Sequence, residues 1–234
     1  YNFTTPEFNV NIAQLPFWSL SILFTWRCFT HDKISDYVFL GVCIGLGILS
    51  KYIFTYLILG IILFFIYLVI TRKKIKFLKI FISCFIVLLI LFPHINWLID
   101  NNFTTIMYGL KRTGETGHII NHIVHPIIFL VKQIGILIPL FVMFFLLLKK
   151  NKLRVNLKDK KLIFLYSINI LPILLILITS VVTGSKIRTM WMTPFYLFFG
   201  VLFVYMLRSQ IDLKKIKLFL YSFLFLFFLS PAIY

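Results

Sequence analysis

Acidic residues are scarce in this sequence, which has 7 Asp and Glu against 24 Lys and Arg and a formal net charge of +17. Charged residues of both signs make up only 13% of the chain, whereas soluble domains typically contain about 25%. Hydrophobic residues make up 61%, and the mean hydropathy is +0.99. The low charge excludes a soluble globular domain and indicates an integral membrane protein.

Strict alternation of polar and apolar residues is also missing, which argues against a transmembrane β-barrel. Apolar runs instead fit the roughly 20-residue helical span of a hydrocarbon core. The sequence therefore predicts an all-α, polytopic transmembrane helical bundle of about eight spans. These spans are expected near residues 11–29, 36–50, 53–70, 77–99, 127–148, 162–183, 191–207 and 218–234.

Cysteine is rare, and no CxxC or Cys/His spacing is present, so neither a zinc site nor a disulfide framework is indicated. The three cysteines are Cys28, Cys43 and Cys84. His118, His122 and His125 have a spacing that can share one helical face, but no carboxylate or thiolate partner is evident beside them, and we predict no metal site. The sequence also lacks the Walker A, GxGxxG, HExxH and nucleophile-elbow motifs. No motif therefore supports a nucleotide-driven or hydrolase function.

The basic residues lie in short blocks between apolar runs and form no continuous stripe, so nucleic acid is not an expected partner. The main blocks are residues 71–79, 149–161 and 208–217, with a weaker block at 27–33. The positive-inside rule assigns these blocks to the cytoplasm. Of the 24 Lys and Arg, 18 fall in these connections and 6 on or near the opposite, outer side.

A single lysine interrupts the apolar run at residues 41–65. A lysine at the centre of a span is penalised by roughly 2.5–3.5 kcal/mol. Lys51 is therefore expected at the apex of a tight helical hairpin, at or slightly below the outer surface, and Gly41, Gly45 and Gly47 before it predict close helix packing. Two interpretations stay open for Lys51: a side chain that snorkels to the head groups, or a cation that binds a ligand.

Unusual polar groups gather at the predicted outer ends of the spans. They are Glu7, Lys51, His94, Asp100, Lys186 and Arg188. Two or three cations at one membrane depth suit a phosphate or diphosphate, and a nearby carboxylate adds acid/base capacity. A lipid-linked phosphate fits this depth because its tail stays in the bilayer. The alternatives are an ordinary charged loop for Lys186 and Arg188, and a first-turn carboxylate favoured by the helix dipole for Glu7.

Four segments carry a resemblance to a known family. They are TTPEFNVNIAQLPFWSLSILFTWR (4–27), GLGILSKYIFTYL (45–57), FPHINWLIDNNF (92–103) and TGSKIRTMWMTPFYLFFG (183–200). Together they resemble the polyprenyl-phosphate-dependent membrane glycosyltransferases of the GT-C type. The resemblance is to the protein-mannosyltransferase-like and aminoarabinose-transferase-like branch, glycosyltransferase family 39 and relatives. The Gly-rich segment around Lys51 is the most specific of the four.

The resemblance implies inverting transfer of a sugar from a polyprenyl-phosphate carrier to an acceptor hydroxyl or phosphate, without a nucleotide sugar or a dissociable cofactor. Lys51 would hold the carrier phosphate with Lys186 or Arg188, and Glu7 would be a catalytic carboxylate. We expect His94 and Asp100 to be candidates for contacts with the acceptor or the sugar. The implied partners are the lipid-linked donor, the bilayer, and an acceptor protein or glycolipid such as lipid A. The implied location is the bacterial inner membrane, with the site facing the periplasm or exterior.

One departure from the family pattern is that its principal acidic motif belongs to a first external loop upstream of residue 1. Residues 1–234 are therefore expected to be a transmembrane glycosyltransferase domain that is incomplete at both ends and inactive alone. Another lipid-carrier enzyme, such as an O-antigen ligase or polymerase, is an alternative. So are a secondary transporter or lipid flippase and a purely structural membrane subunit. A transporter would place its charges near the bilayer midplane, whereas the ionisable groups here cluster toward one face.

Overall fold

A computed structural model of the protein describes residues 8–71, 77–113, 118–148 and 159–233. Regular structure in these ranges is helical, apart from an isolated β-bridge between Leu148 and Ile211, which confirms the all-α class. The α-helices are α1 (Val10–Ala13), α2 (Leu15–Thr30), α3 (Ile34–Ser50), α4 (Thr55–Ile70), α5 (Phe77–Asp100), α6 (Thr104–Arg112), α7 (Asn121–Leu147), α8 (Lys160–Thr183), α9 (Phe199–Leu207) and α10 (Ile216–Ile233). The 3-10 helices are η1 (Tyr52–Phe54), η2 (Thr189–Tyr196) and η3 (Leu213–Lys215).

The expected count of eight spans is too high for the described helices. Four of them are long and apolar enough to cross a membrane, namely Tyr52–Ile70, α5, α7 and α8. The pair η2 and α9, bent by 49°, makes a fifth if it is one span. The apolar run that begins near residue 11 breaks at Gln14, which leaves α2 with 16 residues, and the turn at Lys51 limits α3 to 17. Both are shorter than the roughly 20 residues of a full span.

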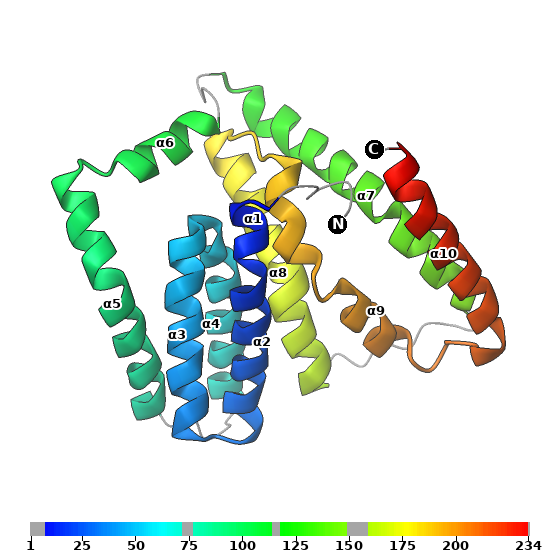
Figure 1. Ribbon diagram of the computed structural model, residues 1–234, viewed down its shortest axis with the longest axis horizontal. Helices are drawn as coiled ribbons and strands as arrows, with labels where there is room; N and C mark the ends of the chain where they lie inside the picture. The colour runs from blue at the N-terminus through cyan, green and yellow to red at the C-terminus, as the bar shows by residue number, and fades with distance from the viewer. Residues whose placement is uncertain (1–7, 72–76, 114–117, 149–158, 234) are drawn as a thin grey trace.

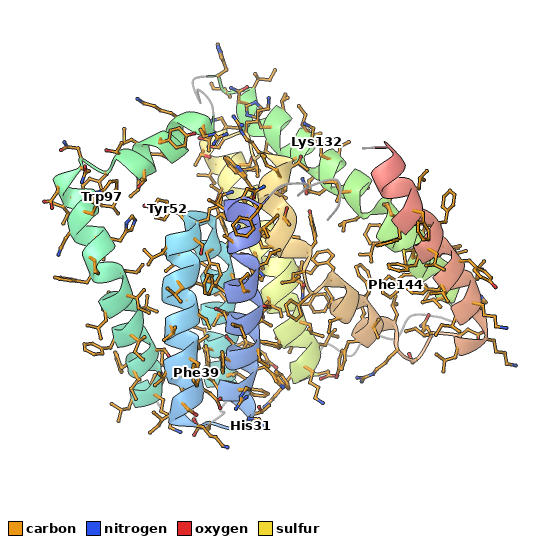
Figure 2. The ribbon with its side chains drawn as sticks, in the orientation of Figure 1. His31, Phe39, Tyr52, Trp97, Lys132 and Phe144 are labelled. Atoms are coloured by element: carbon orange, nitrogen blue, oxygen red, sulfur yellow. The ribbon has the colours of Figure 1, made fainter. Side chains whose placement is uncertain are left out.

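The helices form a bundle with a separate helical pair on one side (Figure 1). Helices α2, α3, α4 and α8 run alongside one another, α5 flanks α3, and α7 pairs with α10. The turn at Lys51 lies at one end of the bundle together with α1 and α6, and we call this the Lys51 end. The opposite end, where α2 turns into α3, is the Arg27 end. Figure 2 shows Tyr52 and Trp97 at the Lys51 end and His31 at the Arg27 end.

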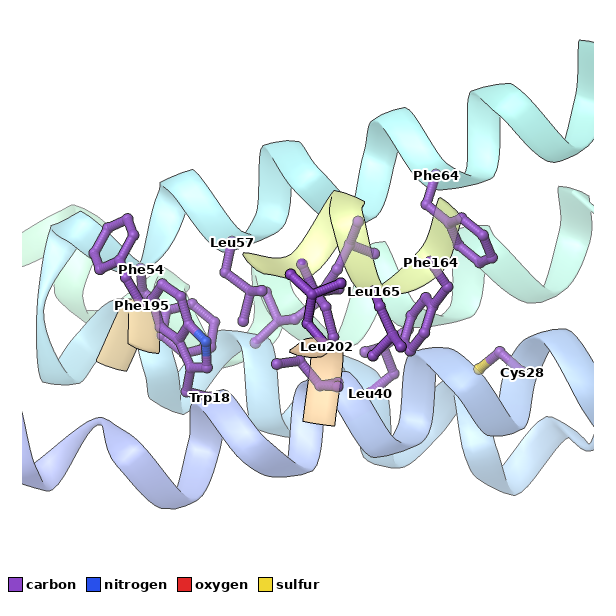
Figure 3. Close-up of a cluster of buried hydrophobic side chains, with 14 of the residues drawn as sticks. Trp18, Cys28, Leu40, Phe54, Leu57, Phe64, Phe164, Leu165, Phe195 and Leu202 are labelled. Atoms are coloured by element: carbon purple, nitrogen blue, oxygen red, sulfur yellow. The ribbon is translucent and has the colours of Figure 1, made fainter. Parts of the chain in front are cut away.

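Aromatic side chains fill the core and join helices that are distant in sequence (Figure 3). The Trp18 ring of α2 lies edge-on to Phe54 at 5.4 Å and against Phe195 of η2 at 4.9 Å, measured between centroids. Near the other end, Phe64 of α4 and Phe164 of α8 are 5.0 Å apart. Such pairs add about 0.5–1.5 kcal/mol beyond the burial of their area. The Trp18 contacts hold η1 and η2 next to each other at the Lys51 end.

Glycine allows the closest helix contacts. A Cβ atom at Gly41 of α3 would lie 2.7 Å from the backbone oxygen of Ser83 in α5. One at Gly45 would lie 2.9 Å from the side chain of Ile90, and one at Gly60 of α4 would overlap the carbonyl oxygen of Ser167 in α8. The close packing that the sequence predicts for the glycines before Lys51 is therefore present, since small residues let helix backbones approach in lipid.

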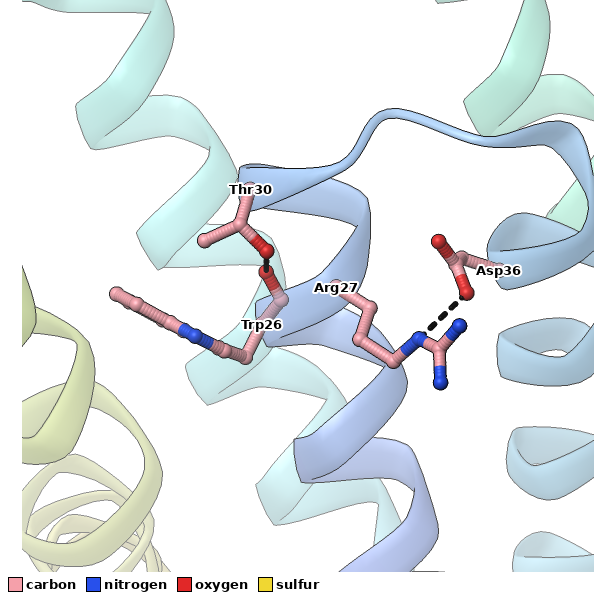
Figure 4. A network of polar contacts seen from close by, with 4 residues as sticks. All are labelled: Trp26, Arg27, Thr30 and Asp36. Atoms are coloured by element: carbon pink, nitrogen blue, oxygen red, sulfur yellow. Dashed lines mark hydrogen bonds and ion pairs between the residues drawn. The ribbon is translucent and has the colours of Figure 1, made fainter.

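A buried ion pair closes the Arg27 end (Figure 4). The Nε atom of Arg27 lies 2.8 Å from Oδ1 of Asp36, and the Asp36 side chain is fully buried while that of Arg27 is 39% exposed. Nearby, Nζ of Lys79 lies 2.9 Å from Oδ2 of Asp32 and connects α5 to the same turn. These pairs join α2, α3 and α5 through their side chains.

Arg27→Ala is expected to destabilise the protein by about 2 kcal/mol, because it leaves the buried Asp36 carboxylate without its cation. The value lies below the roughly 3–5 kcal/mol of fully buried pairs because Arg27 is partly exposed to solvent. Thermal unfolding of the purified protein in detergent measures the change. Arg208→Ala is the matched control, since its ion pair with Asp159 is 3.6 Å long and its side chain is 60% exposed. Equal losses in the two variants would contradict this prediction.

Candidate active site

Lys51 lies in the connection between α3 and η1 and contacts two other segments. Its Nζ atom donates a hydrogen bond to Oδ1 of Asn11 in α1. The same ammonium group lies 5.1 Å from the ring centroid of Trp191 in η2, a distance at which a cation is attracted to the face of the ring. The side chain is therefore directed toward α1 and η2, where side chains from three separate parts of the chain meet.

The local sequence explains how these contacts arise. Asn9 caps α1 by accepting a hydrogen bond from the Asn11 backbone N–H at 2.8 Å, which fixes the start of the short helix that carries Asn11. The backbone N–H of Trp191 donates to the carbonyl oxygen of Arg188 at 3.0 Å, so one turn of chain positions both residues. The predicted phosphate-binding residues Lys186 and Arg188 therefore end three residues before the ring that Lys51 contacts.

Further cations lie at the same end of the bundle. Lys186 and Arg188 have exposed side chains in the connection between α8 and η2. The backbone N–H of Lys186 donates to the carbonyl oxygen of Thr113 at 2.9 Å, and this bond places the connection beside the C-terminal end of α6. Arg112, the last residue of α6, is exposed there. The cations predicted from separate segments are thus brought to one end.

The electrostatic environment of Lys51 favours an anion. Burial, and then repulsion by Arg112, lower the pKa of Lys51 to about 8. Within the described residues, no carboxylate lies within ion-pair distance of its ammonium group. A phosphate placed here would relieve the repulsion and accept charge-assisted hydrogen bonds.

Tyr52, the residue after Lys51, contacts polar side chains of α5 and α6. Its hydroxyl oxygen lies 2.7 Å from Nε2 of His94 in α5 and 2.7 Å from Oγ1 of Thr105 in α6. The His94 ring stacks on Trp97 with an interplanar angle of 10°. His94 is therefore tied to the residue next to Lys51. Asp100 is exposed at the end of α5, and no described hydrogen bond or ion pair joins it to this cluster.

The other residues considered in the sequence are Glu7 and the histidines of α7. Glu7 lies outside the described residues, and its catalytic role stays a prediction. Nδ1 of His122 lies 2.8 Å from the carbonyl oxygen of Val181, and Nδ1 of His125 lies 2.7 Å from that of Gly184. These two histidines therefore connect α7 to the end of α8. Over the described ranges, no group of three or more His, Cys, Asp or Glu side chains is arranged to hold a metal ion.

Sequence reasoning did not single out several residues of this cluster. They are Asn11, Tyr52 and Arg112, and Gln14 between α1 and α2 was not predicted either. Asn11 and Gln14 are almost completely buried although both are polar, and the side-chain amide of Gln14 has no described hydrogen-bond partner. Asn11 and Gln14, two amide side chains three residues apart in a span that was expected to be apolar, were the sequence feature that could have identified this site.

Residues 1–97 match the family model described as dolichyl-phosphate-mannose-protein mannosyltransferase. This match confirms the resemblance to membrane glycosyltransferases of the GT-C type. No curated protein and no solved structure matches the chain.

The GT-C match has consequences for both function and location. The family implies glycosyltransferase activity in general, a lipid-linked sugar donor and a lipid environment. Together with the apolar helices, it supports a multi-pass membrane protein. The matched residues include Lys51, His94 and Glu7, whereas Arg112, Lys186 and Arg188 lie beyond them.

Proposed function

We propose that the protein is a membrane glycosyltransferase that takes a sugar from a polyprenyl-phosphate carrier and transfers it, with inversion, to an acceptor hydroxyl or phosphate. The acceptor is a protein or a glycolipid, and the Lys51 end faces the periplasm or exterior of a bacterial inner membrane. The observation that carries this proposal is the position of Lys51. Its ammonium group lies between the amide oxygen of Asn11 and the ring of Trp191. Arg112 is close enough to repel it, and Arg188 accepts a backbone hydrogen bond from Trp191.

The chemistry assigned to these residues is stabilisation of the leaving group. The acceptor oxygen attacks the anomeric carbon of the sugar, the bond from that carbon to the phosphate oxygen breaks, and the polyprenyl phosphate leaves with the electron pair. The Lys51 ammonium donates hydrogen bonds to the phosphate oxygens, where negative charge increases in the transition state. Lys186 and Arg188 supply further positive charge.

The acceptor needs a group that takes its proton. The resemblance gives this role to the principal acidic motif upstream of residue 1, whose carboxylate takes the acceptor proton as the new bond forms, and Glu7 is proposed as the second acidic residue of the site. His94 and Asp100 are proposed to contact the acceptor or the sugar. His94 has support from its link to Tyr52, which adjoins Lys51.

A photocrosslinking experiment tests the phosphate site without knowledge of the sugar or the acceptor. The full-length protein in proteoliposomes is irradiated with a photoreactive undecaprenyl phosphate, and the labelled peptides are mapped by mass spectrometry. We expect labelling in the segments around Lys51 and Trp191. Unlabelled undecaprenyl phosphate should compete, whereas undecaprenol, which lacks the phosphate, should not. Equal competition by undecaprenol, or labelling confined to the Arg27 end, would overturn the proposal.

The pKa of Lys51 predicts a pH dependence of transfer. Since burial and Arg112 lower this pKa to about 8, the ammonium group is charged below pH 8 and loses its proton above it. The ratio kcat/KM reports the groups of the free enzyme, so it should fall about tenfold per pH unit above roughly pH 8. In Lys51→Arg the guanidinium stays charged, and the fall should disappear or move to higher pH. An identical profile in the two proteins would assign the titration to another group.

A further inference from the structure

The strongest feature outside the candidate active site is a groove along α9. It has a volume of about 560 Å³ and is lined by Leu197, Gly200, Val201, Val204, Tyr205 and Arg208. The opposite side of α9 packs into the protein, because Phe199, Leu202 and Leu207 are buried. The lining residues recur every three or four positions and therefore form one face of the helix. Leu197 and Tyr205 of this face pack partly against the core, whereas Val201 and Val204 are about half exposed.

The groove is apolar and sterically open along most of its length. Val201 and Val204 are 50% and 48% exposed. A Cβ atom added at Gly200 would meet no other atom within 4 Å. The nine residues of α9 rise roughly 13 Å at about 1.5 Å per residue. One leaflet contributes about half of the roughly 30 Å hydrocarbon core, so the helix is about as long as one leaflet is deep.

A positioned cation marks one end of the groove. The Arg208 guanidinium lies 4.1 Å from the centroid of the Tyr205 ring and 3.6 Å from Oδ2 of Asp159. Tyr205 donates a hydrogen bond of 2.7 Å to the same carboxylate oxygen. Asp159 also caps α8 by accepting from the backbone N–H of Lys161 at 3.0 Å. Although it is held in this way, the Arg208 side chain remains 60% exposed.

The charge around this end is predominantly positive. Lys160 and Lys161 begin α8 beside Asp159, and Lys214 and Lys215 lie in η3, which follows α9. The sequence assigns these connections to the cytoplasmic side by the positive-inside rule. Basic pockets between helices on that side bind the head groups of anionic lipids.

We propose that this groove binds an anionic glycerophospholipid of the cytoplasmic leaflet, with one acyl chain along Leu197, Val201 and Val204 and the phosphate at Arg208. Charge complementarity selects this occupant, because an apolar groove that ends in an exposed arginine matches an acyl chain that ends in a phosphate. The carrier lipid of the proposed reaction fits less well, since its phosphate belongs near Lys51 and Trp191 at the opposite end. The choice of a glycerophospholipid over the carrier lipid rests on the proposed function, whereas the binding of an anionic lipid at Arg208 does not require glycosyl transfer.

Native mass spectrometry of the full-length protein tests this site. The protein is released from detergent in the presence of equal amounts of dioleoyl phosphatidylglycerol and dioleoyl phosphatidylcholine, and the bound lipids are counted. We expect the wild type to retain phosphatidylglycerol preferentially. Arg208→Ala should lower the ratio of phosphatidylglycerol to phosphatidylcholine adducts about fivefold, the factor expected for one basic residue near anionic lipid. Lys217→Ala, which removes an exposed lysine that does not line the groove, should leave the ratio unchanged.

A second pair of variants tests the groove itself. Gly200→Leu fills it with a side chain and should lower retention of phosphatidylglycerol at least threefold. Gly135→Leu is the control, because Gly135 lies in α7 and also has open space around it. Monodisperse elution of each variant shows that it is folded. The proposal is overturned if Arg208→Ala behaves like Lys217→Ala, or if Gly200→Leu behaves like Gly135→Leu. Displacement of phosphatidylglycerol by undecaprenyl phosphate would assign the groove to the carrier tail instead.

Discussion

Lys51→Met is expected to lower the rate of sugar transfer by at least 100-fold while the protein remains folded. Methionine keeps most of the length and the apolar stem of lysine but removes the ammonium group that contacts Asn11 and Trp191. Removing one preorganised donor to charge that develops in a transition state costs about 10²–10³ in kcat. Because the leaving phosphate is charged in both the ground state and the transition state, we expect KM to rise as well. A transfer assay with the full-length protein and radiolabelled polyprenyl-phosphate sugars measures both constants.

Two controls separate the role of Lys51 from a general effect of losing a lysine in an apolar region. Lys132→Met makes the same change at an exposed lysine of α7 and should leave transfer within about twofold of wild type. Lys51→Arg keeps the charge and should retain part of the activity, since guanidinium also binds phosphate but with a different geometry. If Lys51→Met and Lys132→Met have the same rate, Lys51 is a snorkelling side chain and the phosphate site lies elsewhere.

Folding itself should tolerate the loss of the Lys51 charge. The pKa of this lysine is lowered to about 8 by burial and by Arg112, so folding weakens the preference for the charged form, although the ammonium group remains protonated at pH 7. Methionine removes that penalty and fits an apolar environment. We therefore expect Lys51→Met to be at least as stable as the wild type and yet to lose transfer. A purely structural role for Lys51 predicts instead that stability and transfer fall together.

The sequence predicted the positions of helices best where the bilayer imposes a large energetic cost on an unpaired backbone group or a charge. Unsatisfied backbone groups are costly in a bilayer, so long apolar runs predict helices, and α5, α7 and α8 lie where such runs were found. The charge of Lys51 required a break in the longest run, and α3 ends directly before it. The number of spans was overestimated because the break at Gln14 and the turn at Lys51 leave α2 and α3 shorter than a full span, and apolar composition does not show these lengths.

The candidate site was predicted less completely than the fold. Charge at one membrane depth grouped Lys51 with Lys186 and Arg188, and the structure brings all three to one end. The neutral partners could not be deduced in the same way, because Asn11 and Trp191 reach Lys51 only through tertiary packing of α1 against η2. Arg112 lies beside the connection after α8 only because α6 ends there, where Thr113 accepts a backbone hydrogen bond from Lys186, and the sequence does not show that contact. Glu7 is not placed by the described residues, so its role still rests on the resemblance.

Gly60→Val is expected to give the largest loss of stability among single substitutions in the bundle, about 3 kcal/mol or more. A Cβ atom at this position would overlap the backbone carbonyl oxygen of Ser167 and would lie 3.4 Å from the ring of Pro172. A backbone atom cannot rotate aside as a side chain can, so α4 and α8 must separate, and overpacking of this kind typically costs 1–3 kcal/mol and sometimes more. The loss should appear as a fall of roughly 10 °C in the apparent unfolding temperature of the purified protein.

Gly200→Val is the matched control for this substitution. It introduces the same β-branched side chain into a helix, with the same intrinsic change in propensity, but a Cβ atom there meets nothing within 4 Å. Its unfolding temperature should stay within a few degrees of wild type, so the difference between the two variants isolates the contact of α4 with α8. That contact also supports the candidate site, because α4 continues from η1 next to Lys51 and α8 leads into the segment of Arg188. We therefore expect Gly60→Val to lose transfer activity together with stability, whereas a stable but inactive Gly60→Val protein would contradict the packing role.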